Sequence, residues 1–259
     1  MKKLITILLF ALAFKAEAQN FPQAAVYPVQ TVRRVATVEA FTIKDSASGA
    51  PLAVPGGYIS GGAGKQVARL GITFSSTTLG YTVASIASES GGNKVDSITT
   101  KTSKVKFSFI DSAANGTGGS DRCWVFGYKI MPSGADTIYV WVASAYNVRI
   151  RVVNWSGVNQ TTPHGTVVKG YQSFGTSVTT TPSVATGDSA WNICAYWRSQ
   201  APLSANTPTM NNYGANIDNG SSNYSLMTTT GHGNGTPTQT FTSGGSGVMT
   251  LMSFAIKHN

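Results

Sequence analysis

The acidic residues of the chain are spaced for turns rather than for catalysis. Glycoside hydrolysis normally places two carboxylates across one cleft. No Glu-x-Asp or Glu-x-Glu pair lies on one strand face, and most acidic residues fall where turns are expected, with Asp bonding nearby backbone N–H groups. Beyond residue 18 the carboxylates are Glu39, Asp45, Glu89, Asp96, Asp111, Asp121, Asp136, Asp188 and Asp218.

The histidines are equally isolated. His164, His232 and His258 lack the His-x-x-x-His or His-Glu-x-x-His spacing of a zinc site. No Gly-x-Ser-x-Gly elbow, which would expose a nucleophilic serine, is present. His232 stands between two glycines, which favours an exposed surface histidine, with a binding contact as the alternative. The sequence therefore predicts that the protein is not an enzyme.

Two further sets of residues leave alternatives open. Asp111 and Asp121 bracket the loop DSAANGTGGSD, whose oxygens could hold Ca²⁺ although the spacing is not that of an EF-hand; no other cofactor is expected. Cys123 and Cys194 lie in strand-like runs. In an oxidising compartment they could form a disulfide, or each could be a small buried apolar residue.

Aromatic side chains are the remaining candidates for ligand binding. Sugar-binding modules lay exposed aromatic rings against pyranose faces, and Asn and Asp bond the hydroxyls. Four rings are placed for this at a strand end, beside a turn or in Asn-rich loops: Trp155, Trp197, Tyr213 and Tyr224. Most other aromatic residues alternate within strands, which is typical of core packing.

The first residues have the pattern of a cleavable export signal. Met1-Lys2-Lys3 is positive, residues 4–14 are apolar, and Ala16-Glu17-Ala18 suits signal peptidase. The apolar run is shorter than the roughly 20 residues that span a bilayer. We expect residues 1–18 to be removed and the mature chain, without a membrane span, to be secreted, extracellular or at the cell surface, with the periplasm as a further location.

The basic residues predict a solubilising surface rather than a nucleic-acid site. The net charge is +9, but beyond residue 18 the lysines and arginines are scattered singly, apart from Arg33-Arg34. Nucleic-acid binding favours a clustered basic stripe with stacking aromatics. We therefore expect no nucleic-acid partner, and at most weak attraction to anionic envelopes or polysaccharides.

The elements expected to position these residues are short β-strands. Residues 19–34 lack periodicity and read as an extended arm, while residues 35–259 read as one domain. No amphipathic helical repeat appears. Apolar residues instead alternate between turn-rich stretches, which predicts an antiparallel β-sandwich of two sheets, jelly-roll or immunoglobulin-like. The expected strands cover residues 35–43, 68–74, 104–109, 122–130, 136–142, 147–155, 190–197 and 247–257.

One segment resembles a known family. Trp155-Ser-Gly-Val-Asn-Gln-Thr-Thr-Pro163 is similar to the Y/F-S-G-V-D-Q-T-T-P segment of a widespread bacterial and phage extracellular β-sandwich module. Other segments resemble that module in the same order: residues 69–73, 95–99, 122–130, 187–191 and 252–257. Asn159 lacks the carboxylate that Asp provides there. The resemblance implies a jelly-roll or immunoglobulin-like sandwich of the kind found in adhesins and virion surface proteins, without a shared enzymatic activity.

These observations predict a non-catalytic, secreted interaction module for adhesion, glycan binding or cell-surface structure, with a polysaccharide or cell-surface glycan as ligand. One alternative is a structural subunit of a surface filament or a virion, as a fibre or decoration protein. In that case the arm of residues 19–34 could add a strand to a neighbour's open sheet edge. A secreted hydrolase with an unrecognised site is the third reading.

Overall fold

Every regular element among the described residues is a β-strand, and all strand pairing is antiparallel, which confirms the all-β, antiparallel prediction. The computed structural model describes residues 39–49, 51, 54–55, 66–88, 95–114, 121–143, 148–197, 203–205, 210–212, 217–218, 224–232 and 235–259. These belong to one contact unit, Val38–Asn259. The expected signal peptide and arm lie outside the described residues.

The strands form three sheets. The central sheet has the order β1 (Thr42–Gly49), β9 (Val148–Ser156), β4 (Tyr81–Ser88), β7 (Asp121–Lys129) and β6 (Ser108–Ala114). The β3–β8 sheet contains β2 (Val54–Pro55), β3 (Gln66–Phe74), β8 (Gly134–Val142) and β5 (Val95–Thr100). The β11–β16 sheet contains β10 (Val168–Thr180), β16 (Gln239–Ile256), β11 (Ser189–Trp197), β15 (Tyr224–His232) and β13 (Met210–Asn212), with β12 (Leu203–Ala205) beside β16 and β14 (Ile217–Asp218) beside β15.

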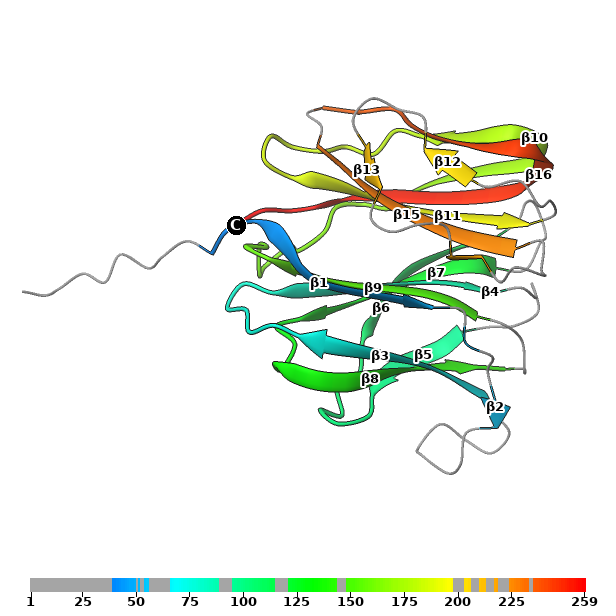
Figure 1. The fold of residues 1–259 in the computed structure, drawn as a ribbon. Helices are drawn as coiled ribbons and strands as arrows, with labels where there is room; N and C mark the ends of the chain where they lie inside the picture. Colours follow the sequence, from blue (N-terminus) through cyan, green and yellow to red (C-terminus); the bar gives the residue numbers. More distant parts are fainter. Residues whose placement is uncertain are drawn as a thin grey trace, which may run out of the picture. The chain divides into compact units, whose positions relative to one another are not determined.

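The central sheet is covered on both faces. Every residue of β4 and β9 is buried, and Figure 1 shows the β3–β8 sheet and the β11–β16 sheet as layers on either side of it. Successive residues of a strand point to opposite faces, so β4 and β9 each contribute to two interfaces. The expected two sheets are therefore corrected to three.

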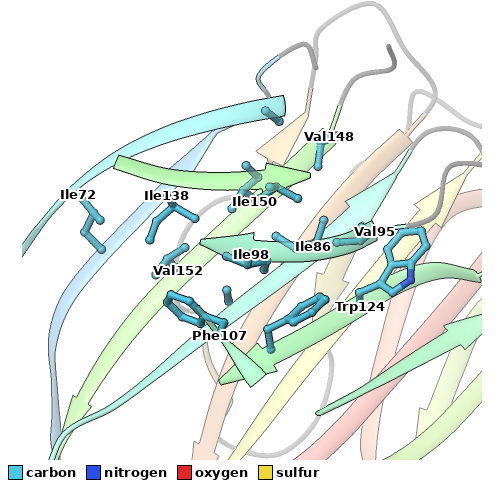
Figure 2. Close-up of a cluster of buried hydrophobic side chains, with 14 of the residues drawn as sticks. Ile72, Ile86, Val95, Ile98, Phe107, Trp124, Ile138, Val148, Ile150 and Val152 are labelled. Carbon is cyan, nitrogen blue, oxygen red and sulfur yellow. The ribbon is translucent and has the colours of Figure 1, made fainter. Parts of the chain in front are cut away.

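The interface between the central and β3–β8 sheets is aliphatic at its centre. Ile72 and Ile138 come from the β3–β8 sheet, and Ile86, Ile150 and Val152 come from the central sheet. Figure 2 shows these side chains between the ribbons, with Phe107 and Trp124. Burial of this kind supplies about 25 cal/mol per Å² of apolar surface removed from water.

The interface between the central and β11–β16 sheets is more aromatic. Trp155 packs edge to face against Trp191, with ring centroids 6.1 Å apart, and stacks on Phe41 at 5.3 Å. Trp191 is fully buried, and its Nε1–H donates to Ser85 Oγ at 3.2 Å. A polar partner inside this interface lets a large indole be buried without losing its hydrogen bond.

Arg149 and Arg151 lie in this second interface rather than in solvent. Alternation along β9 predicts that they point away from Val148, Ile150 and Val152, which is correct, but that face is covered by a third sheet. Arg149 is 0% and Arg151 6% exposed. Burial lowers the pKa of the Arg151 guanidinium. The expectation that all basic residues form a solubilising surface is therefore wrong for these two.

Strand β10 folds back over its own beginning. A Cβ on Gly170 would lie 2.6 Å from Thr179 O, so only glycine allows this approach. The hydroxyls of Thr180 and Ser253 meet there at 2.6 Å. The fold-back covers the outer face of the β11–β16 sheet, where Val178 and Phe241 share a buried cluster with Tyr196.

Within the described ranges no helix has the length and hydrophobicity that a membrane crossing would need.

Candidate functional site

A groove of about 420 Å³ opens where β6 begins. The last pairs of β6 with β7 are Phe109↔Phe126 and Ser108↔Gly127. Strand β7 continues to Lys129, so Tyr128 and Lys129 have no partner in β6. This step between two strands of unequal length leaves the groove, which is lined by Tyr81, Ser108, Phe109, Ile110, Gly127, Tyr128, Lys129, Pro163 and His164.

Phe109 and Tyr128 form the aromatic wall of the groove. Phe109 is 57% exposed, and its ring meets the buried Phe126 edge to face at 5.4 Å. Tyr128 is half-buried and tilts against Phe107 at 5.9 Å. Each ring is thus fixed by a core phenylalanine while part of its surface remains open. A rigid apolar surface next to polar groups is typical of small-ligand sites.

Tyr81 lies at the bottom of the groove. The residue is 4% exposed, and a Cβ on Gly127 would fall 2.0 Å from its hydroxyl oxygen. Glycine at 127 therefore makes room for this phenol. No hydrogen bond joins the Tyr81 hydroxyl to the part of the chain that the structure describes, although buried tyrosine hydroxyls usually find a partner. Burial raises the pKa of the Tyr81 phenol above its usual range.

The opposite wall carries His164 and the cation of Lys129. The His164 ring stacks on Tyr81 at 6.0 Å and meets Phe254 edge to face. Its Nδ1 lies 2.9 Å from Gly165 O, so Nδ1 is the protonated nitrogen in the neutral ring and Nε2 is an acceptor. The exposed Lys129 donates through Nζ to Gln160 O. Among the lining residues, Lys129 is the one permanently charged side chain.

Residues 157–167, here called the connector, hold this wall between two sheets. Asn159 N–H donates to Lys257 O, and Gly165 N–H donates to Ala255 O, both in or next to β16. Val158 N–H donates to Leu79 O, just before β4. The connector therefore joins the β11–β16 sheet to the central sheet beside the groove.

The SGVNQTTP segment supplies the connector's internal bonds. Gly157 has φ +67, and a Cβ there would lie 2.5 Å from Glu39 O. Asn159 Oδ1 accepts the N–H groups of Thr161 and Thr162, both at 2.9 Å. Gln160 Nε2 donates to Val158 O and to Gly80 O. These polar groups shape the backbone, which an Asp at position 159 would also do.

Other described carboxylates are likewise used by the backbone. Glu39 Oε2 accepts the N–H groups of Thr78 and Leu79 at 3.0 and 2.6 Å. Asp45 binds both Ser75 N–H (2.8 Å) and Ser75 Oγ (2.6 Å). These contacts join β1 to the loop before β4, which is the turn-forming role that the sequence predicts.

Asp136 and Asp188 also accept hydrogen bonds from backbone N–H groups. Burial alone would raise the pKa of Asp136, but donors on Thr102, Ser103 and Thr137 outweigh it and lower that pKa to about 2. Asp188 Oδ1 accepts the backbone N–H of His258 at 3.0 Å and lies 2.8 Å from its Nδ1. Asp188 thereby ties the end of the chain to the start of β11.

The sequence-predicted aromatic candidates are dispersed. Trp155 is 3% exposed and packed between Phe41 and Trp191, so it offers no open ring face to a sugar. Trp197 ends β11 and pairs in register with Tyr224, which begins β15. His232, expected at the surface between two glycines, ends β15 opposite Ser189. Tyr213 lies outside the described residues, as do the side chains of Trp197, Tyr224 and His232.

The possible calcium ligands are not brought together as a site in the described residues. Asp111 forms an ion pair with Lys169 at 2.7 Å. Asp121 begins β7, but its side chain lies outside the described part. No group of three or more metal-ligating side chains occurs among the residues searched, which are the described ones.

Cys123 and Cys194 are buried thiols that are not joined as a disulfide. Cys123 lies in the central sheet and Cys194 on the outer face of the β11–β16 sheet, in different apolar clusters. Burial, and secondarily Cys123, raises the pKa of Cys194. The sequence allows either a disulfide or two small buried apolar residues, and the structure has the second arrangement.

The groove was not identified from the sequence because its residues look structural. Alternation places Phe109 on the buried face with Val105 and Phe107, but the strand begins only at Ser108 and has an irregularity between Phe109 and Asp111. Phe109 lies beside Phe126 on the face that alternation predicts, but it is 57% exposed. The one sequence feature that could have indicated the groove is Tyr128-Lys129, an aromatic and a basic residue at the end of an otherwise apolar strand.

Comparison of the chain with protein-family models, with curated proteins and with solved structures found no match.

Proposed function

We propose that the chain is a non-catalytic, secreted module that binds a glycan through the groove at the start of β6. The observation on which this rests is the combination of an exposed aromatic wall, Phe109 and Tyr128, with an unpartnered hydroxyl, Tyr81, at the bottom. A pyranose has the matching chemistry, because its C–H face packs on an aromatic ring and its hydroxyls exchange hydrogen bonds.

A non-catalytic role agrees with how the acidic side chains are used. Glu39, Asp45, Asp136 and Asp188 each accept hydrogen bonds that hold a loop or a chain end. Each of these carboxylates is occupied by donors from the protein itself. None of these four lines the groove.

The experiment is a glycan array probed with the mature chain and with the Phe109→Ala variant. We expect wild-type binding to a defined set of glycans and a loss of about tenfold or more in affinity on removing the ring, as for a contact at the centre of a site. Phe174→Ala is the matched control, because Phe174 is 63% exposed but lies on β10, outside the groove.

An array without bound glycans would contradict the proposal, as would binding that Phe109→Ala leaves unchanged. Trp197→Ala and Tyr213→Ala belong in the same experiment, because the sequence alone favours those rings. A loss confined to them would move the site away from β6.

A second candidate function, a structural subunit of a surface assembly, is favoured by the edge strand β10. Tyr171 and Phe174 are 41% and 63% exposed there, and long edge strands pair readily with other chains. Sedimentation of the mature chain with and without residues 19–34 tests this. Assemblies that vanish on deletion would favour it, and a monomer at all concentrations would contradict it.

We also propose that the layers belong to the jelly-roll or immunoglobulin-like class of sandwich and that the protein acts outside the cell. The antiparallel layers are consistent with the first statement. N-terminal sequencing of the exported chain tests the second, with a new terminus at Gln19 as the expected result.

A further inference from the structure

We infer that the groove selects a carboxylated pyranose, such as a uronic acid residue of an acidic polysaccharide. This inference rests on the proposed glycan-binding function and adds the charge of the ligand. It depends on three features of the groove: its aromatic wall, its single permanent charge and its unpartnered hydroxyl.

The charge of the groove favours an anion. Lys129 supplies the positive charge at the rim, and none of the lining side chains is acidic. The nearest acidic residue in sequence to the lining is Asp111, and the ammonium group of Lys169 neutralises it at 2.7 Å. A carboxylate entering the groove therefore meets a cation without facing an uncompensated negative charge from β6.

Lys129 can bind such a ligand without giving up its present hydrogen bond. Its ammonium group donates to the carbonyl oxygen of Gln160, which uses one of its three hydrogens. The other two remain for a carboxylate. A charge-assisted hydrogen bond of this kind is about twice as strong as a neutral one.

The Tyr81 hydroxyl points to a ring rich in hydroxyl groups. Gly127 leaves room for it, and the His164 ring stacks on the phenol. No described residue accepts its proton, so this hydroxyl is available to donate to an acceptor on a ligand in the groove. His164 Nε2 is an acceptor on the same wall, which suits a sugar hydroxyl as its donor.

Phe109 fixes the orientation of the sugar. The exposed part of its ring packs on the C–H face of the pyranose, while Lys129, which lines the same groove and pairs in register with Tyr81, meets the carboxylate. A neutral hexose would keep the ring contact and lose the ion pair. A small carboxylate without a sugar ring would keep the ion pair with Lys129 and lose the contact with Phe109.

The experiment compares trigalacturonate with its methyl ester, which has the same rings and hydroxyls but no charge. Calorimetry of the full mature chain should show the acid binding about tenfold or more tightly than the ester. Lys129→Gln should remove that difference by weakening only the acid. Tyr81→Phe should weaken both ligands by a similar factor without lowering the Tm.

Lys44→Gln is the matched control, because Lys44 is an exposed lysine on β1, at the opposite edge of the central sheet. It should bind the acid as the wild type does. Equal losses for Lys44→Gln and Lys129→Gln would mean that the net charge attracts the polyanion, and would overturn the inference.

The failure of this inference is distinguishable from failure of the proposed function. Equal binding of the acid and the ester, both lost in Phe109→Ala, would overturn the charge selection and leave a neutral-glycan site. No binding of either ligand, with an array positive only for neutral or sulfated glycans, would also overturn it. An array without bound glycans would overturn both.

Discussion

At the scale of single residues, polar side chains that could serve chemistry are used instead to satisfy backbone groups. Asn159 accepts two N–H groups within the connector, and Glu39 accepts two in the loop before β4. The sequence predicts this turn-forming use of carboxylates and amides well, because it depends on neighbouring residues. It does not reveal Tyr81, whose role depends on Gly127, a residue 46 positions away in the chain but adjacent in the sheet.

Substitutions at Asn159 should separate hydrogen bonding from charge. Asn159→Asp keeps the acceptor for Thr161 and Thr162 and should leave the free energy of unfolding unchanged within about 0.5 kcal/mol. Asn159→Ala removes the acceptor and should lower it by about 1 kcal/mol. Urea titration of both variants measures the difference, and equal stabilities for Ala and Asn would refute this role.

The carboxylate of Asp136 should make stability depend on acid pH. Its pKa is lowered from 3.8 to about 2 in the folded chain. The stabilisation is therefore fully present above pH 4 and is lost as the pH falls toward 2. Asp136→Asn should flatten the stability profile in that window, as measured by thermal unfolding at successive pH values, and an unchanged slope would count against the assignment.

The two cysteines should react as buried thiols. Both are 0% exposed, and burial raises the pKa of Cys194, so the reactive thiolate is scarce. A thiol reagent added without reductant should label neither in the native protein and both after denaturation. Labelling of neither after denaturation would show a disulfide instead.

At the scale of elements, strands whose sequences alternate between polar and apolar residues can be predicted even where both faces are buried, as β9 coincides with the expected residues 147–155. Strand β3 alternates between buried and exposed residues and coincides with residues 68–74 of the prediction. Strand β4 was missed because both faces are buried, so its sequence YTVASIAS has no polar period. Strand β1 covers Thr42–Gly49, while residues 39–41 of the expected strand 35–43 lie outside it. Most of β1 therefore lies in the stretch from Lys44 whose sequence is typical of turns, and it forms an edge strand beside β9.

The connector should tolerate no side chain at Gly157. Alanine there combines a positive φ with a Cβ 2.5 Å from Glu39 O. We expect Gly157→Ala to destabilise the fold by about 2–4 kcal/mol. Gly71→Ala, where no atom lies within 4 Å of the added Cβ, is the control and should change stability by less than about 1 kcal/mol; similar losses at both sites would contradict the steric argument.

At the scale of the whole described unit, three sheets depend on one central sheet. Strands β4 and β9 contribute side chains to both interfaces. The packing of each outer sheet therefore depends on the same two central strands. The sequence could not predict the third layer, since Arg149 and Arg151 indicate a solvated face. That expectation fails because burial of a cation depends on partners from distant parts of the chain.

The shared central sheet should make unfolding cooperative across both interfaces. Trp191→Ala, in one interface, should lower stability by about 3–5 kcal/mol, and Ile98→Ala, in the other, by about 2–5 kcal/mol. In each variant, circular dichroism and tryptophan fluorescence should follow a single transition. Two separated transitions in either variant would show that the layers unfold independently.

The pairing of β1 with β9 has a kinetic consequence. Asp45 and Asn154 are hydrogen-bonded across 109 positions of sequence. The pairing of β1 with β9 therefore forms only at the entropic cost of closing a long loop. Folds dominated by such distant contacts reach the native state slowly, in milliseconds to seconds. During that interval β9 would present an unpaired edge, so the time before β1 pairs with it is the period in which newly made chains can most readily pair with one another.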